Sequence, residues 1–328
     1  MALLLPSPTR ASPRALQIRA WIARIGLTYC TAVAAGQPYS PPRLDNGQPD
    51  LQGVWIASNS TPLQRPAGFS TLVIDEAQAA KLLASLDARA EDRNTPTEPT
   101  EYFEALSIEP IRGQLRSSLI VDPPDGLIPG NDLYKQHIAR ASADVLSAMD
   151  GPEQRPANER CLGSLTVQPP ILSIRNGVNL HQIVQTADSF VFASEFVSAT
   201  RIVRLSPRPM PAVVTTWLGD SIGRWEGDVL VVQTRGFTPS DHFRGGPSSS
   251  FLVSPRTVVV ERFQRVAENR IDYTFVVEDP TYYTQPWKGE SQFIRRDEPI
   301  LEYACHEANY SLIHILEGAR ERERQAQQ

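Results

Sequence analysis

The five histidines and the carboxylates near them are the side chains of this 328-residue chain best suited to chemistry near neutral pH. Asp241 and His242 are adjacent in a loop between two predicted strands. A histidine beside a carboxylate makes a general base, and loops at strand ends often carry function. We therefore predict His242 as a catalytic base that Asp241 orients. The alternative is a solvated loop histidine.

A second histidine opens a predicted strand in the sequence NLHQIVQT. Strand alternation places His181, Ile183 and Gln185 on one face of that strand. A histidine on such a face is most often a hydrogen-bonded residue of the core or of the barrel rim. The other interpretation is that His181 is a catalytic base.

Glu261 lies inside a predicted strand whose two faces are both mostly apolar. A carboxylate in such surroundings needs a partner or has a raised pKa. Arg201, Arg224 or Arg262 could supply the positive charge. A buried structural ion pair is the favoured interpretation, and a desolvated general base is the alternative.

The remaining polar candidates lie near the end of the last predicted strand. Tyr303 is a candidate for stabilising the charge of a developing oxyanion. His306 and Glu307 can ligate a metal or tie the strand end to the following helix by hydrogen bonds, and the second role is favoured. There is no nucleotide-binding loop, no zinc pattern of paired cysteines and no nucleophile elbow, so we expect no cofactor.

Large aromatic side chains recur on successive predicted strands, and most of them must belong to the core. A few that face inward would form a pocket for an apolar or aromatic molecule, with phenol groups as orienting donors. The predicted contacts of this molecule are Trp217, Tyr273, Tyr283, Trp287 and Arg201.

The elements that must position these residues are mainly β-hairpins. Gly53 and Trp55 form a Gly-x-Trp strand entry like that of lipocalin-like barrels, and helices are expected near 75–90, 131–149 and 309–325. Short turns, such as Glu226-Gly-Asp228, predict antiparallel neighbours. The predicted strands are 51–57, 117–121, 180–185, 189–196, 201–205, 212–218, 221–225, 229–234, 257–266, 271–278, 287–296 and 300–305. They predict an antiparallel lipocalin-like barrel with helical insertions and a C-terminal helix. A sandwich is the alternative.

Composition bounds the class of protein. The net charge of −5 without a basic stripe disfavours nucleic-acid binding, and no apolar run is long enough to span a membrane. Residues 1–36 resemble a secretory signal with four arginines and an Ala-x-Ala site, which predicts a periplasmic or secreted protein; a disordered start is the alternative. Residues 37–320 would form one barrel domain, and 321–328 a charged tail. After export, Cys161 and Cys305 would form a disulfide, or remain as two buried thiols.

Several long motifs give the chain a resemblance that covers about 44–320. They are RSSLIVDPPDG (116–126), GPEQRPANERC (151–161), GRWEGDVLVVQT (223–234), VVERF (259–263), VEDPTYYTQPW (277–287) and EYACHEANY (302–310). In them the chain resembles a bacterial family of mostly exported, hypothetical proteins. The resemblance implies export and no particular activity. Where such proteins have an Asn-bearing polar loop, this chain has Ser240-Asp-His-Phe243, which suggests a different ligand or reaction.

These observations favour an exported, cofactor-independent lyase or isomerase that acts on a small aromatic or terpenoid molecule inside the barrel. Proton abstraction by His242 or His181 would begin the reaction, with Asp241 or Glu261 orienting the base and Tyr303 or Tyr273 meeting the oxyanion. One alternative is a periplasmic binding protein without catalysis. Another is a metal-dependent hydrolase. The oligomeric state is not predicted.

Overall fold

The computed structural model describes residues 39–57, 59–91, 107–147, 149–155, 159–163, 167–172, 180–196, 199–206, 208–238, 243–244, 251–307 and 309–328. The chain divides into two compact units, Met1–Tyr39 and Ser40–Gln328, and every element below belongs to the second. Asp241 and His242 lie outside the described residues, so the roles predicted for them stay predictions.

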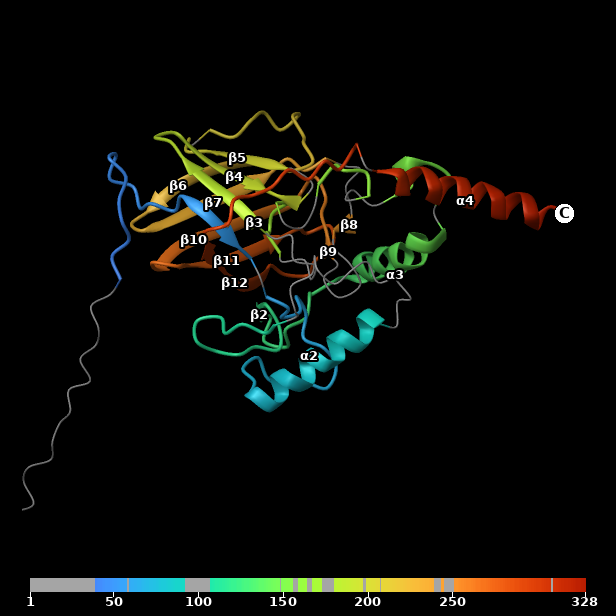
Figure 1. The fold of residues 1–328 in the computed structure, drawn as a ribbon, viewed down its shortest axis with the longest axis horizontal. Coiled ribbons are helices and arrows are strands. Elements are labelled where there is room, and N and C mark those ends of the chain that lie inside the picture. The colour runs from blue at the N-terminus through green and yellow to red at the C-terminus, as the bar shows by residue number, and fades with distance from the viewer. Residues whose placement is uncertain are drawn as a thin grey trace, which may run out of the picture. The chain divides into compact units, whose positions relative to one another are not determined.

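Within the described part of the chain, nine strands close into a barrel in the order β1-β3-β4-β5-β6-β7-β10-β11-β12, and β12 returns to pair with β1 (Figure 1). The predicted lipocalin-like barrel is therefore confirmed. The barrel strands are β1 (Gly53–Ile56), β3 (Leu180–Gln185), β4 (Ser189–Ser194), β5 (Thr200–Arg204), β6 (Asp220–Glu226), β7 (Val229–Arg235), β10 (Val258–Ala267), β11 (Arg270–Glu278) and β12 (Trp287–Arg296).

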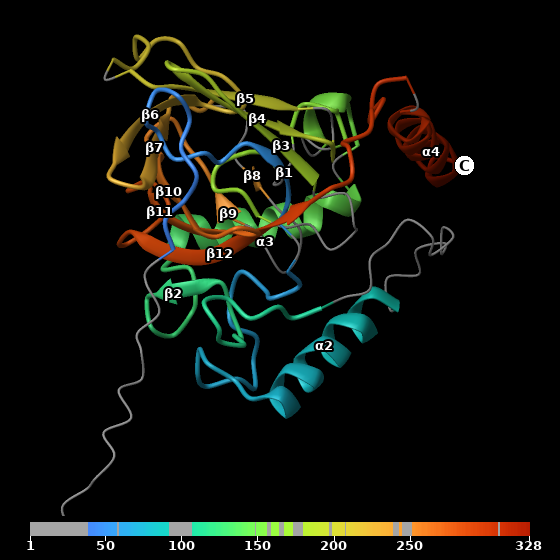
Figure 2. The same ribbon diagram turned by 60° about the vertical axis from the view of Figure 1, so that its left-hand side comes forward.

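Three shorter strands lie outside the ring. β2 (Ile120–Asp122) pairs with the start of β12, while β8 (Phe243–Arg244) and β9 (Phe251–Leu252) form a separate two-stranded ribbon. In the turned view the barrel strands surround the interior, with β5 and β12 on opposite walls (Figure 2).

Alternation along the strands explains which residues face the interior. β3 and β10 each bury every second side chain, as expected for a sheet with one face toward a core. Two-residue turns at Gly227-Asp228 and Glu268-Asn269 connect neighbouring antiparallel strands. Gly227 has a φ of 60°, a conformation that glycine adopts without a Cβ penalty.

The prediction that all neighbours are antiparallel is wrong at one place, because β5 and β6 pair in parallel through Val203–Ser221 and Arg204–Ile222. The predicted strand 212–218 lies in the connection between them. It forms turns instead, and Thr216 makes a single bridge to Phe237. A parallel pair requires a crossover connection, so this segment runs between the strand ends rather than adding a strand. Three prolines at 207, 209 and 211 also remove backbone donors.

The predicted strand 300–305 is also wrong. The segment has no strand, and Leu301 is 69 % exposed. The barrel explains why: β12 already pairs with β11 on one edge and with β2 and β1 on the other. A closed sheet offers no free edge to a further strand.

Three α-helices occur among the described residues: α2 (Glu76–Glu91), α3 (Asp132–Ser147) and α4 (Tyr310–Ala326). A short 3-10 turn, η3, covers Pro152–Gln154. The side chains of Asp75, Asn131 and Asn309 accept hydrogen bonds from backbone N–H groups in the first turns of α2, α3 and α4, as N-caps do. The described helices include none that is both long enough and apolar enough to span a membrane.

Candidate functional site: the barrel interior

A buried polar network in the interior joins side chains from four neighbouring strands, β5, β6, β7 and β10. Arg201 donates from Nε to the Ser221 hydroxyl at 3.0 Å and from Nη1 to Glu261 at 3.2 Å; its Nη2 contacts the second oxygen of the same carboxylate. Thr234 completes the set, 2.9 Å from the Ser221 hydroxyl. Glu261 is fully buried, so the favoured interpretation of a structural ion pair holds, with Arg201 as its partner.

Tyr273 of β11 extends this network to segment 167–172. Its hydroxyl donates to Glu261 at 2.8 Å and accepts from the backbone N–H of Ile171 at 2.8 Å. Burial, followed by the negative charge of Glu261, raises the pKa of the phenol well above its usual value. Tyr273 therefore stays protonated, and its O–H is engaged in the hydrogen bond to Glu261.

His181 lies elsewhere in the same interior, packed against aromatic rings. Its ring centroid lies 4.7 Å from that of Phe192 and 5.7 Å from that of Phe293, and the side chain is 0 % exposed. Desolvation lowers the pKa of the imidazole to about 3, so His181 is neutral near pH 7. Neither ring nitrogen has a hydrogen-bond partner among the described residues. Most buried polar atoms have one, so this orphaned ring requires an explanation.

A row of aromatic rings joins His181 to Trp287. Successive centroids lie 5.7, 5.4, 5.6 and 5.8 Å apart along the row His181, Phe293, Tyr273, Phe275 and Trp287. Trp287 is 0 % exposed, and its indole N–H has no partner in the described structure either. Gly289 makes room for this row, because a Cβ there would lie 2.2 Å from the ring of Phe275.

Of the other residues predicted from the sequence, Tyr283 meets the end of this row, with its ring centroid 6.0 Å from that of Trp287, and the rest lie apart from it. Tyr283 exchanges two hydrogen bonds with the backbone of Leu252 and so holds β9, while Trp217 packs in the β5–β6 connection, 5.7 Å from the guanidinium of Arg160. Tyr303, His306 and Glu307 are exposed, and the Tyr303 ring lies 5.0 Å from that of Phe196. No group of three potential metal ligands occurs among the described residues.

Cys161 and Cys305 form the predicted disulfide, with their Cα atoms 5.8 Å apart. Asn309, at the start of α4, donates to the carbonyl of Glu159 at 2.7 Å. Arg320 in the same helix donates to the carbonyl of Met149 at 2.6 Å. The disulfide and these two contacts together fix the C-terminal helix to Met149 and to the segment at Glu159–Cys161.

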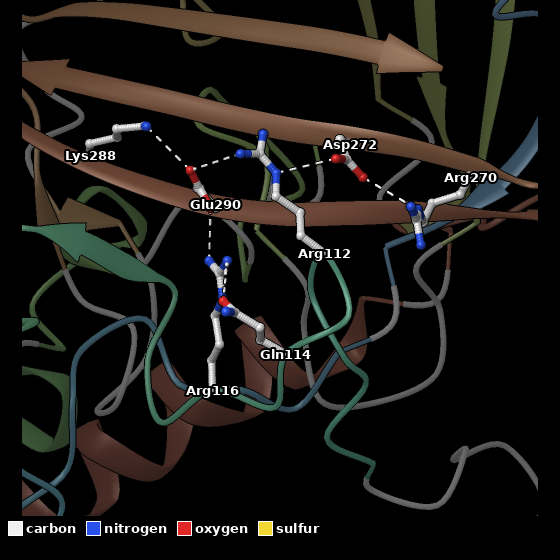
Figure 3. A network of polar contacts seen from close by, with 7 residues as sticks. All are labelled: Arg112, Gln114, Arg116, Arg270, Asp272, Lys288 and Glu290. Carbon is white, nitrogen blue, oxygen red and sulfur yellow. Dashed lines mark hydrogen bonds and ion pairs between the residues drawn. The ribbon is translucent and has the colours of Figure 1, made fainter. Parts of the chain in front are cut away.

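A charged cluster on the outer wall is the second concentration of polar groups (Figure 3). Glu290 is bound by Arg116 at 2.8 Å, Lys288 at 3.2 Å and Arg112 at 3.3 Å. Asp272 is bound by Arg112 at 3.2 Å and by Arg270 at 3.3 Å. Because each of these cations already contacts a carboxylate, the cluster is best explained as a clamp between segment 107–116 and the wall formed by β11 and β12.

Sequence reasoning missed two parts of the interior. Ser221 and Thr234 were ordinary strand residues until their pairing across β6 and β7 placed them beside Arg201. Segment 167–172 was not predicted to enter the core, although all six of its residues are buried. Its apolar run around two prolines was the available signal.

Comparison with known proteins gives no function to transfer: no protein-family model matches the chain, and no curated protein matches it. The geometry itself defines the candidate site. It combines a neutral imidazole without a partner, an indole donor without a partner, a row of aromatic rings between them, and an ion pair whose charges cancel. Such a set can hold a small molecule by apolar contact and a few hydrogen bonds.

Proposed function

We propose that the barrel binds a small, largely apolar molecule next to His181. The observation that carries this proposal is the fully buried imidazole whose two nitrogens lack partners in the described structure. An unsatisfied buried polar atom costs about 1–3 kcal/mol, and a bound molecule would recover that cost. The rings of Phe192 and Phe293 beside His181 would supply the apolar contact.

Catalysis is a separate part of the sequence prediction. Glu261 is engaged by Arg201 and Tyr273, and none of the hydrogen bonds described for a carboxylate reaches His181. This arrangement favours binding over proton abstraction by His181. The lyase or isomerase activity based on Asp241 and His242 stays a prediction, as does metal-dependent hydrolysis.

Binding is tested with the full chain and the neutral fluorescent probe N-phenyl-1-naphthylamine. We expect saturable binding of one probe per chain. His181→Trp and Phe293→Trp each put a larger ring at the imidazole or at the ring that contacts it, on the two strands that flank β1. Each should abolish binding, whereas Gln182→Trp on the outer face of β3 should not. Variants are compared after cooperative thermal unfolding has been verified. The proposal would be refuted if the wild type showed no saturable binding, or if binding were unchanged in both His181→Trp and Phe293→Trp.

Export is the second part of the proposal. The Cys161–Cys305 disulfide supports it, because such bonds persist in oxidising compartments. Cell fractionation followed by thiol labelling tests it. Recovery of the protein in the cytosol with free thiols would contradict it.

A further inference from the structure

The charges inside the barrel indicate which class of molecule could bind beside His181. The guanidinium of Arg201 contacts both oxygens of Glu261 and two hydroxyls, and Tyr273 donates to the same carboxylate. The pair is therefore neutral as a unit, with its donors and acceptors in use. It offers a ligand no unbalanced charge.

Arg265 is the other inward-facing cation. Its guanidinium donates to the carbonyls of Asp50 and Glu268 and lies 5.6 Å from the indole of Trp55. Arg295 covers the same indole at 5.8 Å. These contacts commit Arg265 to closing one end of the barrel. Its buried Nε has no partner in the described structure, so an acidic ligand must be tested directly.

Apart from the Nε of Arg265, the polar groups without a partner beside the aromatic row are neutral. A neutral imidazole has one N–H donor and one acceptor nitrogen, and the indole of Trp287 has one donor. Both lie among aromatic rings, with Phe192 and Phe293 against His181 and Phe251 and Phe275 against Trp287. Two of these three open groups are donors, which match the oxygen of a hydroxyl or carbonyl.

Resting on the proposed binding function, we infer that the ligand is an uncharged, ring-containing alcohol, phenol or ketone whose oxygen hydrogen-bonds to His181. Buried water would satisfy the same nitrogen. A ligand hydroxyl replaces such a water and adds its apolar body to the contact. An acid or an amine would instead bring an uncompensated charge into an apolar site.

A matched series of naphthalene, 2-naphthol, 2-naphthoate and 2-naphthylmethylammonium tests this inference, because the ring system is constant. Calorimetry with the full chain should show 2-naphthol binding about tenfold more tightly than naphthalene, the value expected for one hydrogen bond, and both ions binding more weakly. The preference should be lost in His181→Phe. It should remain in His181→Gln, which keeps a donor and an acceptor, and in Gln182→Phe on the outer face.

The possible outcomes distinguish failure of the inferred ligand class from failure of the proposed binding function. If no member of the series binds to the wild type, the binding function itself falls. If naphthalene and 2-naphthol bind equally, or the preference survives in His181→Phe, the function stands and the role of His181 is refuted. Tightest binding of 2-naphthoate would overturn the neutral class and assign the anion to Arg265.

Discussion

His181 shows how burial alone can change what a residue does. Its pKa is lowered by desolvation, without a neighbouring positive charge among the causes. The unfolded chain binds a proton at this histidine near pH 6.5, whereas the folded protein does so only at about pH 3. Stability contributed by neutral His181 is therefore fully present above pH 6.5 and is lost as the pH falls toward 3.

This difference predicts a measurable pH dependence of unfolding. Each unit of pH below 6.5 should cost about 1.4 kcal/mol, so moving from about pH 7 to about pH 5 should remove about 2 kcal/mol through His181. Urea denaturation of the wild type and of His181→Phe at both pH values measures the term. Gln182→Phe should behave like the wild type. Equal pH dependence in the wild type and His181→Phe would contradict the assignment.

At the residue scale, alternation in the sequence grouped His181 with Ile183 on one face and indicated that Glu261 needs an arginine. The core position favoured for His181 agrees with its burial, but the hydrogen bonds expected with it are absent from the described structure. The strand pattern did not identify which arginine, since Arg201, Arg224 and Arg262 all lie on predicted strands and none is distinguished by its position in the sequence. The choice depends on barrel closure, which brings Arg201 of β5 across to β10, while the other two bind Glu226 outside. Pairings between distant strands are not encoded in local periodicity.

Among the elements, α4 depends most on a covalent constraint. The Cys161–Cys305 disulfide closes a segment of 144 residues and anchors the start of the helix, where Asn309 adds a hydrogen bond, while Arg320 adds another from the second half of the helix. Elements attached by so few contacts open more readily than core strands do.

Replacing the pair by Cys161→Ala and Cys305→Ala should lower the free energy of unfolding by up to about 5 kcal/mol on the chain-entropy model. Hydrogen exchange in α4 should accelerate more than in β10 and β11. If the double variant keeps wild-type stability and α4 protection, the disulfide does not anchor the helix.

The elements predicted least well from the sequence are those whose pairing depends on how the sheet closes into a barrel. Hairpins such as β6–β7 and β10–β11 follow from local turns and alternating side chains, and they were predicted to within a residue or two. Segments 212–218 and 300–305 have strand-like composition, yet the structure gives them no place in the ladder. Whether a strand edge is free for pairing depends on the whole closed sheet and cannot be read from one segment of the sequence.

On the scale of the whole molecule, the clamp around Glu290 connects the barrel to the segment that follows α2. Arg116 has 5 % of its side chain exposed and Glu290 has 8 %, so this pair is buried, whereas the side chain of Lys288 is 41 % exposed. Burial raises the pKa of Glu290, but the hydrogen bond from Arg116 and the charge of Arg112 outweigh it, and the pKa is lowered.

Glu290→Gln leaves the buried Arg116 without a carboxylate and should destabilise the protein by about 3 kcal/mol. Lys288→Gln removes an exposed partner of the same carboxylate and should cost less than about 1 kcal/mol. Denaturant unfolding compares the two variants. Equal losses would mean that the cluster acts as a surface network and not as a buried clamp.

The parallel seam between β5 and β6 has a kinetic consequence. Two residue pairs hold it, whereas β10 and β11 share a ladder of nine. His181 is buried from solvent, so a ligand can reach it only when the barrel opens locally. We expect this opening to occur first between β5 and β6, where the ladder is shortest. Uptake and release would then be slow together. A ligand enclosed during folding would persist through purification. The half-life of ligand exchange, more than the affinity, would then decide which molecule is found in the purified protein.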